Sequence, residues 1–112
     1  MLAKFESFAL LVFEMPHVRI SWPYGCKHLV MLAGSWSGWR PQVLIPVRVE
    51  QLVEPACGRT ILIEVWTAEV RLPDNPDVHR YKFVVDGEWM FDAAQPSLPN
   101  AYGSFDNYVK VS

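Results

Sequence analysis

The sequence has few of the features that mark membrane, nucleic-acid-binding or secreted proteins. Its longest uninterrupted apolar run, Phe8 to Phe13, has six residues, far fewer than the ~20 that a transmembrane helix needs. The run has no basic segment before it and no small-residue cleavage site after it, so we expect no signal peptide. Lys and Arg are scattered along a chain of net charge −2, which gives no basic stripe for nucleic acid.

Cysteine is scarce as well, with only Cys26 and Cys57. Without a leader, the default interpretation is two reduced thiols in a cytoplasmic protein, and a disulfide between them is the open alternative. A chain of 112 residues has room for one core but not for two. We therefore expect residues 1–112 to form one domain, and nothing in the sequence implies a cofactor.

Sustained helical periodicity is also missing, and the chain instead reads as short strands separated by turns. The candidate strands are rich in Val, Ile, Phe, Tyr and Trp, with Gly, Pro, Asn and Asp between them. They are Phe8–Phe13, Val18–Trp22, Leu29–Ala33, Val43–Val49, Ile61–Val70, Arg80–Val85, Glu88–Phe91 and Phe105–Val111. Seven or eight such strands predict an all-β fold in which two sheets form a sandwich.

Two segments have the composition of long loops. Glu50–Thr60 carries Pro55 and Gly58, and Leu72–Asp77 reads Leu-Pro-Asp-Asn-Pro-Asp. Such residues are typical of turns. We expect both segments to be loops, and we expect the first to tolerate shortening.

The most informative local segment is the hairpin predicted over His79–Asp92. Asp86-Gly87 between two β-rich runs is a strong signal for a two-residue type I′ turn, which needs positive φ at both positions. The turn fixes the cross-strand pairs. These are Val85 with Glu88, Val84 with Trp89, Phe83 with Met90 and Lys82 with Phe91.

Alternation along the hairpin separates a core face from an outer face. Tyr81, Phe83 and Val85 have the character of a core, which leaves Lys82 and Trp89 as diagonal neighbours outside. An outward indole with a cation beside it suits a pyranose ring, whose C–H face packs on the ring while its hydroxyls need polar partners. The plainer alternative is that Trp89 covers the sheet edge and Lys82 is simply solvated.

At this hairpin the sequence resembles a known family. The run His79 to Trp89, followed by Asp92 and Pro96, is similar to the glycogen-binding domain of AMP-activated protein kinase β subunits, a member of carbohydrate-binding module family forty-eight. Upstream, Leu-Ala-Gly-Ser-Trp-Ser-Gly-Trp over 32–39 matches the family pattern Leu-Ser-Gly-Ser-Phe-Asn-Asn-Trp. Downstream, residues 102–111 match its Leu-Gly-Thr-Val-Asn-Asn-Ile-Ile-Gln-Val ending. The three motifs cover His17 to Val111 in the family's order, and the resemblance implies an immunoglobulin-like β-sandwich.

The resemblance also implies a set of sugar-binding positions. The stacking tryptophans would be Trp39 and Trp89, and the side chain inserted into the curve of the glucan would be Tyr102. The groups that hold hydroxyls would be Lys82, Ser104, Asp106 and Asn107.

The sequence departs from the family pattern in and around these positions. Ser37-Gly38 replaces the Asn-Asn that precedes the first tryptophan, which predicts a freer loop around Trp39. Tyr102 is flatter and larger than the family's leucine. Asp106 replaces an asparagine, and an ionised carboxylate accepts hydrogen bonds but donates none.

The remaining notable residues favour structural roles. Trp22, Trp36 and Trp66 lie in or against strand runs, so we expect them in the core. The histidines have no metal-ligand spacing, and no catalytic pattern of Ser/His/Asp, paired carboxylates or a phosphate loop is present.

The sequence thus predicts a non-catalytic module that binds α-1,4-linked glucan such as glycogen, starch, maltooligosaccharides or cyclodextrin. A kinase or a glucan-active enzyme is the protein partner that the resemblance implies, with no membrane and no nucleic acid. Two alternatives stay open at this point. One is a protein-interaction sandwich of the same family with a decayed glucan site, and the other is a non-catalytic remnant of a glucan-active enzyme.

Overall fold

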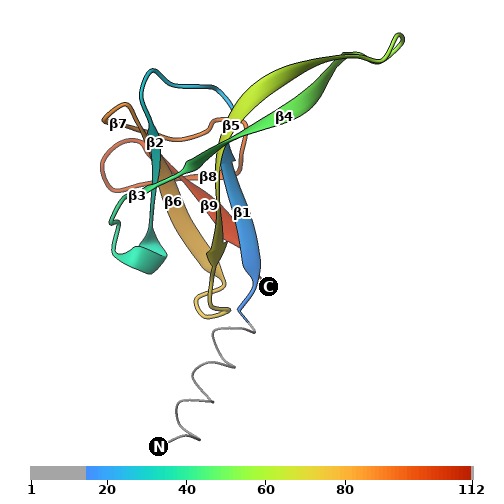
Figure 1. Ribbon diagram of the computed structural model, residues 1–112. Helices are drawn as coiled ribbons and strands as arrows, with labels where there is room; N and C mark the ends of the chain where they lie inside the picture. The colour runs from blue at the N-terminus through green and yellow to red at the C-terminus, as the bar shows by residue number, and fades with distance from the viewer. Residues whose placement is uncertain (1–14, 112) are drawn as a thin grey trace, which may run out of the picture.

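The computed structural model describes residues 15–111, so the strand expected at Phe8–Phe13 lies outside the described residues. Nine strands and one short 3-10 helix make up this part of the chain (Figure 1). In chain order they are β1 (His17–Trp22), β2 (Val30–Gly34), η1 (Ser35–Ser37), β3 (Gln42–Val43), β4 (Ile45–Glu54), β5 (Arg59–Arg71), β6 (Val78–Val85), β7 (Glu88–Met90), β8 (Ser97–Pro99) and β9 (Phe105–Lys110).

The strands form two antiparallel sheets that pack as a β-sandwich, which confirms the predicted fold class. One sheet has the order β1-β5-β4, and the other has the order β3-β2-β6-β9-β8 with β7 paired to β6. The described part holds more strands than the seven or eight expected, for two reasons. The run predicted at Val43–Val49 divides at the buried Leu44, and the short β8 was not predicted.

The core lies between the two sheets. Its buried side chains are Ile20, Trp22, Val30, Leu32, Leu44, Trp66, Val70, Leu72, Tyr81, Phe83 and Val85. Trp22 and Trp66 are therefore core residues, as predicted, and Trp36 is partly buried and packs against the same cluster. The rings of Trp22 and Phe83 join the two sheets, with centroids 5.0 Å apart.

The β6–β7 hairpin has the predicted register. Val85 pairs with Glu88, Val84 with Trp89 and Phe83 with Met90, and the fourth expected pair lies beyond the end of β7. Asp86 and Gly87 have φ of 51° and 87°, the signs that a type I′ turn requires. The Asp86 carboxylate also accepts hydrogen bonds from the backbone N–H groups of residues 27, 28 and 29, so the turn is tied to the segment before β2.

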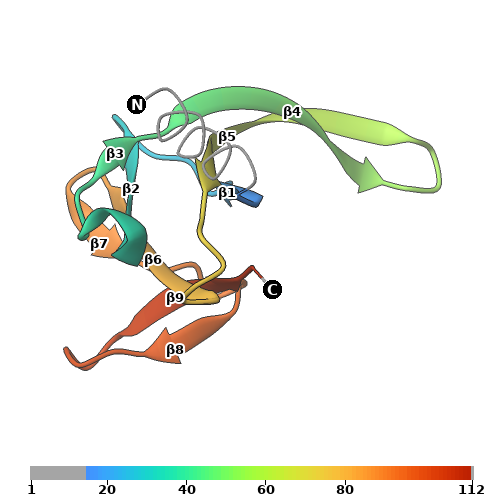
Figure 2. The ribbon, with the colours of Figure 1, turned by 90° about the horizontal axis from the view of Figure 1, so that it is seen from below.

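The segment Glu50–Thr60 is not a loop, and that prediction is wrong. Residues up to Glu54 extend β4, residues from Arg59 extend β5, and a four-residue turn joins them. We call residues 45–65 the arm; Figures 1 and 2 show it reaching well beyond the sandwich. Leu72–Asp77, by contrast, contains no strand or helix, as predicted.

Two further findings bear on the sequence analysis. Cys26 and Cys57 are both free thiols. No helix within residues 15–111 has the length and apolar character that crossing a membrane demands.

Candidate functional site

An open hollow of about 730 Å³ lies on the outer face of the six-stranded sheet. Its lining brings together β6, β7, the end of β8, β9, the segment that joins β8 to β9, and the turn after η1. The lining residues are Trp39, Arg80, Lys82, Trp89, Pro99, Asn100, Ala101, Tyr102, Ser104 and Asp106. Six of the seven residues that the resemblance singled out are among them, although up to 67 positions separate them in the chain.

Three aromatic side chains, Trp39, Trp89 and Tyr102, line the hollow. Trp89 lies on β7 and is 51% exposed, while its cross-strand partner Val84 is buried. Tyr102 lies in the segment between β8 and β9 and is 94% exposed, so its ring is held by very little of the protein itself. Tyr81 and Phe83 point to the opposite side of β6 and are buried. The rings of Trp89 and Tyr102 therefore contribute little to the core, and their faces are free to contact a ligand.

The turn after η1 presents Trp39 to the hollow. Trp36 packs its ring against Gly34 in the space that a Cβ would fill, so only glycine fits at position 34. The Gly34 carbonyl then accepts the Trp39 N–H at 2.9 Å. Gly38 and Trp39 both have φ of 64°, a conformation that glycine adopts without strain but tryptophan does not. The Ser37-Gly38 replacement thus forms a defined turn, in which the Ser37 hydroxyl donates to the Gly34 carbonyl at 3.2 Å.

Asn100 shapes the segment that carries Tyr102. Its side-chain oxygen accepts the backbone N–H groups of Tyr102 and Ser104, both at 3.0 Å. Its own backbone N–H donates to the Ser104 carbonyl at 3.0 Å, and Gly103 takes a φ of 78°. An asparagine that bonds the backbone two residues ahead is a standard way to fix a tight turn. The Tyr102 backbone is therefore held in place although its ring is free.

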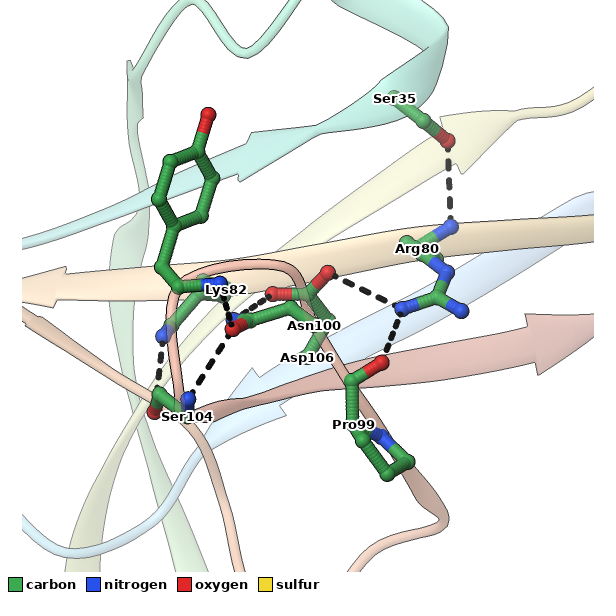
Figure 3. Close-up of polar contacts among 8 residues, drawn as sticks. Ser35, Arg80, Lys82, Pro99, Asn100, Ser104 and Asp106 are labelled. Carbon is green, nitrogen blue, oxygen red and sulfur yellow. Dashed lines mark hydrogen bonds and ion pairs between the residues drawn. The ribbon is translucent and has the colours of Figure 1, made fainter.

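Charged and polar groups form a connected set beside the aromatic rings (Figure 3). The Lys82 ammonium donates to the Ser104 hydroxyl at 3.4 Å. A guanidinium nitrogen of Arg80 lies 3.3 Å from one Asp106 carboxylate oxygen and donates to the Pro99 carbonyl at 3.0 Å. The other Asp106 oxygen accepts the Asn100 amide at 3.0 Å. These bonds fix the orientation of the polar groups before any ligand arrives.

Asn107 is the one predicted site residue that does not line the hollow. It pairs with Tyr81 across β9 and β6, on the core side of the sheet, and it is 0% exposed. Its side-chain oxygen accepts the Asp92 N–H at 2.7 Å and its amide donates to the Asp92 carbonyl at 2.8 Å. Asn107 therefore holds the segment after β7 in place from the core side of the sheet.

Two tyrosines that interact with the Asp92 carboxylate have raised pKa values. Burial raises the pKa of Tyr81 to about 12, with a smaller contribution from the Asp92 carboxylate. The hydrogen bond from Tyr24 to Asp92, 2.7 Å long, raises the pKa of Tyr24. Both phenols thus stay neutral at physiological pH. Within residues 15–111, no three His, Cys, Asp or Glu side chains gather closely enough to bind a metal.

Arg80 and Asn100 are site residues that the sequence analysis did not name. Arg80 precedes Lys82 by two positions, so the alternation that placed Lys82 outside also places Arg80 there. Asn100 lies in the run Pro-Asn-Ala-Tyr-Gly, whose composition is typical of a turn. Both signals were present in the sequence.

Comparison with known proteins identifies the family of the chain. The sequence profile of the glycogen recognition site of AMP-activated protein kinase matches residues 16–112 of the chain. The chain belongs to this family. As a glycogen-recognition domain, it is a non-catalytic, glycogen-binding module with a β-sandwich fold.

Kinase subunits are among the relatives of this glycogen-recognition domain. It is 34% identical over 96 residues to SNF1 protein kinase subunit beta-3 of Saccharomyces cerevisiae, covering 85% of this chain and 19% of the yeast protein. It is 30% identical over 93 residues to the 5'-AMP-activated protein kinase subunit beta-2 of Mus musculus, covering 82% of this chain and 28% of the mouse protein. A third relative is the Cruciform DNA-recognizing protein 1 of Saccharomyces cerevisiae, 29% identical over 98 residues, which are 88% of this chain and 18% of that protein. The chain thus spans less than a third of each of these relatives.

Proposed function

We propose that the hollow binds a curved stretch of α-1,4-linked glucan, with glucose rings stacked on Trp39 and Trp89. The observation that carries the proposal is the convergence of three aromatic side chains with Lys82 and Arg80 around one open hollow. A pyranose presents an apolar C–H face and a rim of hydroxyls. A ligand site with exposed rings and a few fixed polar groups matches both surfaces.

The aromatic side chains of the site account for its expected selectivity for a curved glucan chain. Tyr102 is almost fully exposed between β8 and β9, so it can insert into the concave side of a curved α-1,4 chain while the two indoles contact its sugar faces. A flat β-1,4 chain such as cellulose has no concave side for Tyr102 to fill. We therefore expect maltoheptaose and β-cyclodextrin to bind and cellulose fragments to bind poorly.

The polar part of the site orients the sugar. Lys82 and Ser104 lie next to each other and can share hydroxyl contacts, and Arg80 supplies further donors beside them. Each oxygen of Asp106 already accepts one hydrogen bond from the protein, and a carboxylate oxygen can accept a second from a hydroxyl. Asn107 acts indirectly, because its amide is buried and bonded to the backbone at Asp92.

Two of the departures from the family pattern, at Ser37-Gly38 and at Asp106, would favour the alternative of a decayed site, but both have a defined place in the fold. Ser37-Gly38 forms a bonded turn that presents Trp39, and Asp106 is accompanied by Arg80. The proposal for the larger protein follows from the relatives. Two of them are kinase β subunits, of which this domain covers 19% and 28%. We propose that the domain anchors a kinase or a glucan-active enzyme on cytoplasmic glycogen.

A sedimentation assay with insoluble amylose tests the proposal. Wild-type protein should co-sediment with amylose and not with cellulose, Trp89→Ala should stay in solution, and Trp89→Phe should keep part of the binding because it retains a ring. Wild-type protein that stays in solution with amylose, or Trp89→Ala that sediments like wild type, would reject the site.

A further inference from the structure

The arm has a free strand edge. β4 is the outermost strand of the sheet β1-β5-β4, and all ten of its residues are exposed. Within residues 15–111, no strand pairs with the other side of β4. A long exposed edge presents unpaired backbone N–H and C=O groups, and it is a template for pairing with another strand.

One face of the arm is strongly apolar. Val47 pairs with Val65 and Val49 pairs with Ile63, so their side chains share a face, and this is the face opposite to the core residue Trp66. Ile45, Val49 and Ile61 on this face are 66%, 38% and 43% exposed. Neighbouring exposed apolar side chains are a feature of sites of protein contact.

The charges on the other face of β4 indicate which strand can pair with the free edge of β4. Arg48 and Glu50 lie two positions apart and therefore on the same face, with Val49 between them. We propose that β4 pairs antiparallel with β4 of a second copy of this chain, with the two Val49 residues directly opposite each other. In that register Arg48 of each copy faces Glu50 of its partner, so two ion pairs flank the twofold axis. A symmetric interface of this kind uses the same patch on both copies.

Neighbouring registers are less favourable. If one β4 strand is shifted by two residues along the other, either Arg48 faces Arg48 or Glu50 faces Glu50, depending on the direction of the shift. Like charges directly opposite each other destabilise a sheet. A register that pairs Arg48 with Glu54 would run through the irregularity in the ladder between Leu52 and Glu54. An intermediate register would place the apolar face of one copy beside the charged face of the other.

The geometry leaves the rest of the molecule free. Pro46 has no N–H to donate, so the proposed ladder relies on Val47 to Gln51. Antiparallel pairing places the two sandwiches at opposite ends of the joined arms, which extend away from the body of each copy (Figure 2). The hollow lies on the other sheet and stays open, so the inference is independent of the proposed glucan function.

Charge exchange tests the inference, with sedimentation velocity measured from micromolar to millimolar concentration. The first variant is Glu50→Arg, whose partner within the arm is Leu62, so no internal ion pair is lost. The second is Arg48→Glu combined with Glu64→Arg, which keeps an opposite-charge pair between positions 48 and 64 of β4 and β5. Circular dichroism melting of both variants checks that they fold.

We expect a concentration-dependent dimer for wild type, monomers for each variant alone, and a dimer again when the two variants are mixed in equal amounts. In the mixture, each Arg of the first variant faces a Glu of the second. A wild-type chain that stays monomeric at millimolar concentration overturns the inference, since it would indicate a different partner for the arm. A Glu50→Arg variant that dimerises as wild type does would also overturn it, since the contact would then not involve this edge.

Discussion

Arg80 and Asp106 form an ion pair on the buried side of the hollow, with 3.3 Å between a guanidinium nitrogen and a carboxylate oxygen. The Asp106 side chain is 9% exposed and the Arg80 side chain is 38% exposed. The carboxylate at position 106, where the family pattern has an asparagine, therefore has a positive partner in this chain. The ion pair therefore holds the Arg80 guanidinium in a fixed orientation beside the aromatic rings.

Replacing Asp106 with Asn tests that relationship. The amide oxygen can still accept a hydrogen bond from Asn100, but the charge that holds Arg80 is gone. Because Asp106 is buried and the new amide nitrogen would direct a donor at Arg80, we expect a loss of stability of roughly 1–3 kcal/mol, and glucan affinity should fall less than in Trp89→Ala. Urea unfolding and calorimetric titration measure the two effects. An Asp106→Asn variant that binds glucan more tightly than wild type would show that the carboxylate hinders the site.

Gly38 provides a test of how Trp39 is presented. Its φ of 64° favours glycine, and no atom lies within 4 Å of the position that a Cβ would take. Gly38→Ala should therefore suffer backbone strain of about 1–2 kcal/mol without a clash, and Gly38→Asn should suffer less because asparagine tolerates this conformation. We expect Gly38→Ala to lose glucan affinity as well as stability. Gly58→Ala at the tip of the arm, where φ is 69° and space is equally open, carries the same strain but should leave both glucan affinity and the melting midpoint nearly unchanged, because the arm tip makes no contact with the core.

Shortening the arm should leave the sandwich intact even though the arm is a hairpin and not a loop. All residues from 50 to 62 are exposed, so their removal takes nothing from the core. Val49 and Ile63 are cross-strand partners, and joining them through Asn-Gly keeps the register of the remaining strands. Melting followed by circular dichroism should stay cooperative with a nearly unchanged midpoint. A broad, uncooperative transition would contradict the prediction.

Asp86 predicts a specific pH dependence of stability. Hydrogen bonds from the backbone N–H groups of Lys27 and His28 hold the pKa of this carboxyl below its ordinary value in the folded state. The unfolded state therefore binds a proton more readily, so the stabilisation is present above the ordinary carboxyl range and is lost as pH falls through the lowered pKa. Asp86→Asn retains the turn geometry but not the charge. Urea unfolding should show wild type more stable than this variant at neutral pH and the two curves converging in acid. A gap that stays constant down to acid pH would contradict the assignment.

Much of the fold was predictable because local signals agreed with tertiary packing. Asp86-Gly87 specified a turn, and alternation around it separated buried Phe83 from exposed Trp89. The arm was missed because Pro55, Gly58 and several polar residues made a hairpin tip resemble a loop, and an arm with no core contact lacks the alternation that burial imposes. β8 was missed because its three residues end in a proline, and its position depends on pairing with β9.

Most of the positions that line the hollow were predictable from the sequence, but the hydrogen-bond network among them was not. The resemblance supplied Trp39, Lys82, Trp89 and Tyr102, which do line one hollow. The resemblance implied that Asn107 contacts sugar. Because side chains alternate along a strand and Asp106 points outward, Asn107 must point inward, and the structure shows it buried. The hydrogen bonds of Asn100 to residues 102 and 104 depend on the conformation of one tight turn, which composition alone does not fix.

The central claim is that Trp89 belongs to a ligand platform and Phe83 to the core. Phe83 is 1% exposed and Trp89 is 51% exposed. Phe83→Ala should cost roughly 3–5 kcal/mol and melt far below wild type. Trp89→Ala should cost no more than about 1–2 kcal/mol, because half of its surface already faces water.

The most direct measurement is calorimetric titration of maltoheptaose into wild type and Trp89→Ala, with the melting temperature of each sample recorded alongside. The account predicts saturable binding to wild type, no measurable binding to Trp89→Ala, and melting of this variant much closer to wild type than to Phe83→Ala. Absence of heat with wild type at millimolar ligand, or equal affinity in the two proteins, would contradict it.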